Sequence, residues 1–109
     1  MAEQKETEQK IAQLQLYEQS LQSILMQKQQ FQSQELEIQS ALKELEKTKE
    51  AYKIVGNIMV ATKKEDLKED LDSKKETANL RIKTIEKQEN QIREKAKKLQ
   101  EEVSKSMQD

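Results

Sequence analysis

The chain has 109 residues, of which 33% are hydrophobic, 3% aromatic and 38% charged. It is long enough for one domain and too polar for an ordinary globular core. Its 20 basic and 21 acidic residues leave a formal net charge of -1, which argues against a nucleic-acid-binding protein with its usual basic face. Proline is absent and glycine occurs once, so the composition is typical of long helices and coiled coils rather than of a disordered chain.

The residue types also exclude several kinds of chemistry. Cysteine and histidine are both absent, which removes thiol catalysis, imidazole acid-base chemistry and the usual zinc sites. A single glycine cannot build a phosphate-binding loop. No apolar stretch is long enough to span a membrane, and no secretory signal is visible. We therefore expect no catalytic residues, no metal, no cofactor, no nucleic-acid or membrane partner, and an intracellular protein.

The first predicted element is a helix over residues 7–48. Its apolar residues recur at alternating spacings of three and four, as the a and d positions of a coiled coil do. The two registers of this seam are Leu14, Leu21, Lys28, Glu35 and Leu42, and Tyr17, Ile24, Phe31, Ile38 and Leu45.

The period changes in residues 51–63, which are mostly apolar and include Gly56 followed by Asn57. A Gly-Asn pair between such runs predicts a two-residue β-hairpin turn, because glycine accepts the positive φ that these turns require. The alternative is a β-branched helical linker, in which the glycine would cost only about 1 kcal/mol. We favour the hairpin, which pairs Tyr52 with Ala61, Lys53 with Val60, Ile54 with Met59, and Val55 with Ile58.

A second helix is predicted over residues 64–106, with acidic residues in its first turn, where the helix dipole favours them. The spacing of three and four returns here. Its registers are Leu71, Ala78, Ile85, Ile92 and Leu99, and Lys75, Ile82, Glu89, Ala96 and Val103.

Folding the chain back at the Gly-Asn junction brings the seam positions of the first helix opposite those of the second helix. This places Leu14 opposite Leu99 and the bulky Tyr17 opposite the small Ala96, as packed antiparallel layers require. We interpret polar seam residues such as Lys28 as register devices and not as functional sites. The sequence thus predicts an antiparallel pair of helices joined by a β-hairpin.

The predicted hairpin is largely apolar on both faces and has two open edges. An isolated two-stranded hairpin is marginally stable in water, so strands from other chains must complete the sheet. The predicted oligomer interface contains Tyr52, Ile54, Val55, Gly56, Asn57, Ile58, Met59 and Val60.

The segment from Ala51 to Val60, flanked by two coiled-coil arms, resembles the central hairpin of archaeal-type prefoldin beta subunits. The resemblance covers nearly the whole chain, including Gln27-Lys28-Gln29 in the first arm and the Leu42-Lys43-Glu44-Leu45 approach to the hairpin. It implies a single prefoldin-like domain over residues 1–109, mainly α. In this fold a long antiparallel two-helix coiled coil is joined by a short β-hairpin that assembles into an inter-subunit β-barrel.

The resemblance also implies a function. Prefoldins are cytoplasmic, ATP-independent holdase chaperones, built as hexamers of two alpha and four beta subunits. Their coiled-coil tips bind non-native polypeptides and pass them to a group II chaperonin. An alternative reading of the residues is a structural coiled-coil scaffold subunit that binds one fixed folded partner.

We call the ends of both arms nearest the termini the arm tips. They carry more apolar residues than the a and d positions of the coiled-coil seam require. Leu16 falls off the seam, and Val103 and Met107 lie opposite a polar segment, residues 2–10. The alternative is that these residues merely finish the coiled coil. The candidate client-binding residues are Ile11, Leu14, Leu16, Tyr17, Leu99, Val103 and Met107.

Overall fold

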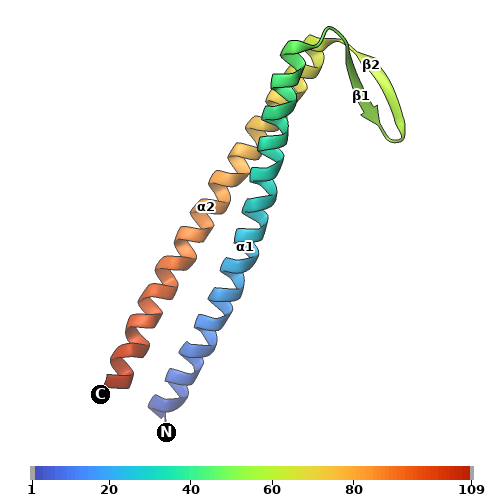
Figure 1. The fold of residues 1–109 in the computed structure, drawn as a ribbon. Coiled ribbons are helices and arrows are strands. Elements are labelled where there is room, and N and C mark those ends of the chain that lie inside the picture. Colours follow the sequence, from blue (N-terminus) through green and yellow to red (C-terminus); the bar gives the residue numbers. More distant parts are fainter. Residues whose placement is uncertain (1, 109) are drawn as a thin grey trace. The chain divides into compact units, whose positions relative to one another are not determined.

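A computed structural model describes residues 2–108, and its elements follow in the order helix, strand, strand, helix (Figure 1). Helix α1 spans Ala2–Lys47, strand β1 Ala51–Val55, strand β2 Ile58–Thr62 and helix α2 Lys64–Gln108. The two long helices and the antiparallel hairpin between them are confirmed. The hairpin interpretation of residues 51–63 is therefore correct, and the helical-linker alternative is wrong.

Both helices extend further toward the termini than the apolar spacing predicts. Helix α1 begins at Ala2 instead of residue 7, and α2 continues to Gln108 instead of residue 106. The added first turn contains Glu3, whose charge suits a helix N-terminus. The Thr7 hydroxyl also donates a hydrogen bond to the Glu3 carbonyl over 2.9 Å. These residues contain no helix breaker, so the helix continues where the apolar pattern has stopped.

Two side chains donate hydrogen bonds to backbone carbonyl groups at the C-terminus of α1, next to the hairpin. The Thr48 hydroxyl donates to the Leu45 carbonyl over 3.4 Å, directly after the last residue of α1. The Lys64 ammonium donates to the Glu46 carbonyl over 3.2 Å. Carbonyl groups at a helix C-terminus lack partners within the helix, and a cation is a favourable partner for them. These contacts satisfy carbonyl groups at the end of α1.

The described residues divide into two compact units. The first unit comprises the described residues up to Lys28 together with those from Lys83 onward, and the second comprises Gln29–Ile82. Each unit contains one stretch of both helices, and the second also contains the hairpin.

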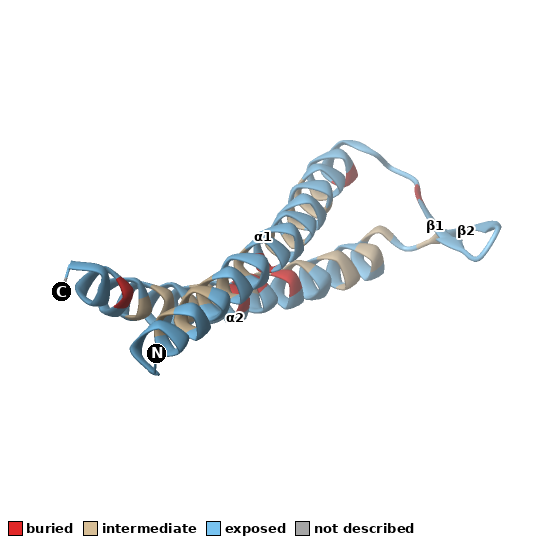
Figure 2. Ribbon diagram, turned by 90° about the horizontal axis from the view of Figure 1, so that it is seen from below, coloured by how far each residue is buried: buried red, intermediate tan, exposed pale blue. Residues whose placement is uncertain are grey.

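Within both units the buried residues follow the predicted seam. Every predicted seam position of α1 and α2 is buried or half-buried. Figure 2 shows the buried positions as short bands on helices whose remaining surface is mostly exposed. The most buried seam residues are Ile24, Leu45, Ala78, Ile82, Ile85 and Val103. Because this core is narrow, its stability comes from many repeated layers and not from one large cluster.

Polar residues in the seam of the first unit are paired across the helices. The Lys28 ammonium lies 3.8 Å from a carboxylate oxygen of Glu86 and 3.8 Å from one of Glu89. The Arg93 guanidinium is 3.9 Å from the same Glu89 oxygen. The lysine therefore sits at a seam position without an unpaired charge, which supports its interpretation as a register device.

The second unit contains a similar polar layer around Glu35. The Asn79 amide, oriented with its nitrogen toward Glu35, donates to the two carboxylate oxygens over 3.0 and 2.8 Å. The Gln39 amide donates to Glu35 from the same helix over 3.4 Å. A shift of one helix along the other would break the bonds between Asn79 and Glu35, so the layer favours one register.

The hairpin has the predicted register at every pair. Tyr52 faces Ala61, Lys53 faces Val60, Ile54 faces Met59, and Val55 faces Ile58. Gly56 adopts a φ of 62°, the left-handed conformation that side-chain-bearing residues rarely adopt. The turn therefore depends on this glycine.

Replacing Gly56 by alanine is expected to loosen the hairpin without a steric clash. A Cβ atom at this position would have no neighbour within 4 Å, so the cost is conformational, about 1–2 kcal/mol. Amide hydrogen exchange in β1 and β2 should accelerate about tenfold. Gly56→Asn is the matched variant, because asparagine tolerates this conformation better. Equal exchange rates in wild type and Gly56→Ala would contradict the prediction.

Candidate functional site

The hairpin exposes its large apolar side chains on both faces. Tyr52, Ile54 and Met59 lie on one face, and Val55, Ile58 and Val60 lie on the other. Their exposed fractions range from 46% for Val60 to 71% for Ile54. Only the end of the hairpin nearest the helices is covered, where Ala51 is buried and Thr62 is half-buried. Exposed apolar surface gathered in one element marks an interaction site.

The edges of the hairpin are open as well. The sheet has two strands, so each strand keeps one row of backbone N–H and C=O groups without a partner in the sheet. Such edges pair readily with strands of another chain. Together the faces and edges form a surface suited to other β-strands. Six of the predicted interface residues lie on it, and Gly56 and Asn57 form the turn between the strands.

At the arm tips, in the first unit, the structure separates the predicted client-binding residues into two groups. Leu16 and Met107 are 55% and 73% exposed. Val103 is 8% exposed and thus packed in the seam. The remaining members are half-buried at or beside seam positions: Ile11, Leu14, Tyr17 and Leu99.

Val103 is packed because the polar first turns of α1 still lie against α2 at this point. Thr7, Lys10 and Ile11, in the first turns of α1, are half-buried. The Lys10 ammonium lies 3.3 Å from a carboxylate oxygen of Glu102, the neighbour of Val103. The two helices therefore still contact each other here, and Val103 is not left facing an open chain end.

A cleft of about 730 Å³ lies between the first turns of α1 and the last turn of α2. Ile11 and Met107 supply its apolar lining, and the rest of the lining is polar or charged. Methionine is flexible and fits irregular partners. Met107, which is 73% exposed, is part of the cleft wall.

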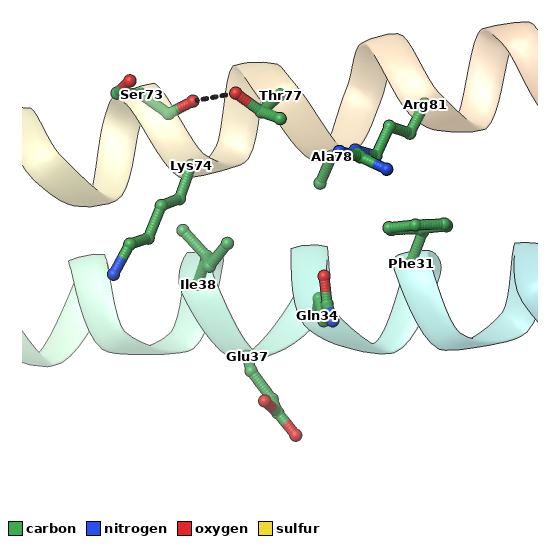
Figure 3. A pocket seen from close by; sticks show the side chains of 9 residues that line it. All are labelled: Phe31, Gln34, Glu37, Ile38, Ser73, Lys74, Thr77, Ala78 and Arg81. Atoms are coloured by element: carbon green, nitrogen blue, oxygen red, sulfur yellow. Dashed lines mark hydrogen bonds between the residues drawn. The ribbon is translucent and has the colours of Figure 1, made fainter. Parts of the chain in front are cut away.

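The second unit contains a groove that the sequence did not indicate (Figure 3). It has a volume of about 350 Å³, and Phe31, Ile38 and Ala78 supply its apolar surface. The Arg81 guanidinium lies 5.6 Å from the centroid of the Phe31 ring, within the range of a cation–π contact. The Thr77 hydroxyl, on the rim, donates to the Ser73 carbonyl over 3.1 Å.

The groove forms because a small residue of one helix lies opposite large residues of the other helix in the seam. The side chain of Ala78 is too short to fill the space between Phe31 and Ile38. The only signal in the sequence is this small residue at a seam position, and its meaning depends on which residues face it.

The described residues contain no group of three or more acidic, cysteine or histidine side chains arranged to hold a metal ion. Within the same residues, no helix is both long and apolar enough to cross a membrane. The surfaces that stand out are therefore the apolar hairpin, the arm tips and the groove.

Comparison with known proteins assigns the chain to a family. The family model described as prefoldin subunit matches residues 8–109. The chain belongs to the prefoldin subunit family. The crystal structure of the prefoldin beta subunit from Thermococcus strain KS-1 has the same fold, with a TM-score of 0.88 and 33% identity. The match covers 93% of this chain and 91% of that one.

Curated prefoldin beta subunits from archaea are similar over most of their length. The subunit of Archaeoglobus fulgidus is 41% identical, and that of Thermococcus onnurineus 38%, each over 85% of this chain and 83% of the relative. The subunit of Methanosarcina acetivorans is 36% identical over 89% of this chain and 86% of the relative. The resemblance noted in the hairpin and arms is confirmed. Prefoldin is a chaperone family and not a known enzyme family, and membership implies a hetero-oligomer with other prefoldin subunits.

Proposed function

We propose that the chain is the beta-type subunit of a cytoplasmic, ATP-independent holdase. It assembles as four copies with two alpha-type subunits, binds non-native polypeptides at its arm tips and passes them to a group II chaperonin. The observation that carries the proposal is the hairpin, which is apolar and exposed on both faces and open at both edges.

The hairpin supports assembly through a shared sheet. Its exposed side chains must leave water for the protein to be stable and free of aggregation. Adding strands at the open edges satisfies the backbone, and closing the sheet into a barrel removes the edges altogether. Hairpins from six subunits, packed as an inter-subunit β-barrel, achieve both.

The arm tips support client binding. Leu16 and Met107 are exposed in the first unit, and Met107 lines a cleft that is partly apolar. Helix ends also open more easily than helix centres, so half-buried residues near them, such as Ile11, can join the exposed ones. The lone glycine, Gly56, lies in the hairpin turn and not in a phosphate-binding loop, which fits binding and release without ATP.

The test is aggregation suppression by the chain assembled with an alpha-type subunit from the same organism. Native mass spectrometry should give six chains in a two-to-four ratio. Without ATP, near-stoichiometric complex should slow the aggregation of several unrelated denatured proteins, and added group II chaperonin should accept the bound client. A scaffold subunit with one folded partner would protect none of these clients, and that result would refute the holdase proposal.

A further inference from the structure

The hairpin contains one charged residue, Lys53, in strand β1. It pairs with Val60 and shares its face of the sheet with Val55 and Ile58. All three neighbours are apolar and exposed. The ammonium group is therefore placed in the middle of a surface that is otherwise built for burial.

Lys53 has no ion pair among the described residues. The nearest acidic residue in the sequence, Glu50, accepts a 2.9 Å hydrogen bond from the hydroxyl of Tyr52. Tyr52 and Lys53 are adjacent in β1, so their side chains point to opposite faces. Glu50 is thus held on the face that Lys53 does not share.

When another subunit covers this face, the charge of Lys53 strongly affects the free energy of association. An ammonium group that loses water without gaining a counter-charge costs several kcal/mol. A carboxylate on the covering strand would remove that cost. A second copy of this chain has no acidic residue between Ala51 and Thr62, so its hairpin can offer only another lysine.

We propose that Lys53 makes the hairpin select an unlike subunit, one whose hairpin strand presents an aspartate or glutamate, over a second copy of this chain. The inference rests on the proposed shared sheet and adds the chemistry by which the sheet chooses its strands. The carboxylate pairs with the ammonium as the interface closes, whereas two copies bring like charges together, which disfavours their association.

The experiment mixes the chain with an equimolar amount of the alpha-type subunit from the same organism. Native mass spectrometry measures the ratio of mixed assemblies to assemblies of this chain alone. Lys53→Met should lower that ratio about tenfold, because it removes both the attraction to the unlike strand and the penalty between copies. Lys53→Glu should lower the yield of mixed assembly further, since a carboxylate would then face a carboxylate. Lys53→Arg should keep the wild-type ratio.

Lys63→Met is the matched control, because Lys63 is an exposed lysine just outside β2. It removes the same charge and should leave the ratio unchanged, and circular dichroism should show equal helicity in all variants. An unchanged ratio for Lys53→Met and Lys53→Glu would overturn the inference. So would a Lys53→Arg variant that behaves like Lys53→Met, because side-chain shape and not charge would then set the ratio. Absence of mixed assemblies with the wild-type chain would instead refute the proposed function.

Discussion

Replacing Ile58 by aspartate is expected to disperse the mixed assembly while leaving the single chain folded. Ile58 is 67% exposed in the chain by itself, so the new carboxylate remains in water until another subunit covers it. Burial in the shared sheet then leaves an unpaired charge, at a cost of several kcal/mol. Val60→Asp should disperse the assembly less, because Val60 pairs with Lys53, whose ammonium can partner the new carboxylate. Size-exclusion chromatography and native mass spectrometry measure the outcome, with circular dichroism to follow the helices.

Met26→Asp is the matched control for this experiment. Met26 is 66% exposed, nearly the same as Ile58, but it lies on α1 and not on the hairpin. The control variant should assemble like the wild type. A full hexamer with Ile58→Asp would show that the hairpins do not form a shared buried sheet.

Much of this fold could be predicted because its determinants are local. The alternating spacing of three and four places one side of each helix in the seam, and every position so assigned is buried or half-buried. Gly56 and Asn57 define a two-residue turn, and a two-residue turn leaves one register for the strands, the one observed. Period and turn chemistry are properties of neighbouring residues, so a single sequence contains them.

The features that could not be predicted depend on contacts between elements. The start of α1 at Ala2 is one example, because the polar first turns carry no apolar period to mark them. The packing of Val103 is hidden for a similar reason, because the α1 turns near it are polar and interrupt the apolar spacing. The groove beside Phe31 is another, because it arises from the side chains that face each other across two helices. Such features need the positions of both helices, which spacing along one chain does not provide.

The second large effect is expected from the arm tips. Deleting the residues before Gln13 and after Glu102 removes Val103 and Met107 and breaks the ion pair between Lys10 and Glu102. The hairpin belongs to the other unit and is untouched, so the hexamer should survive with near-normal helicity per residue. Aggregation suppression should need about ten times more hexamer, equivalent to about 1.4 kcal/mol of binding free energy.

A double substitution separates client binding from the loss of helix length. Leu16→Ser with Met107→Ser removes the two exposed apolar side chains of the tips without shortening either helix. The matched control, Met26→Ser with Leu36→Ser, removes one methionine and one leucine that are 66% and 63% exposed elsewhere on α1. The first pair should weaken protection of denatured clients, and the control pair should not, because exposed apolar area matters only where the client binds. Equal protection by both double variants and by the truncated hexamer would place the client site away from the tips.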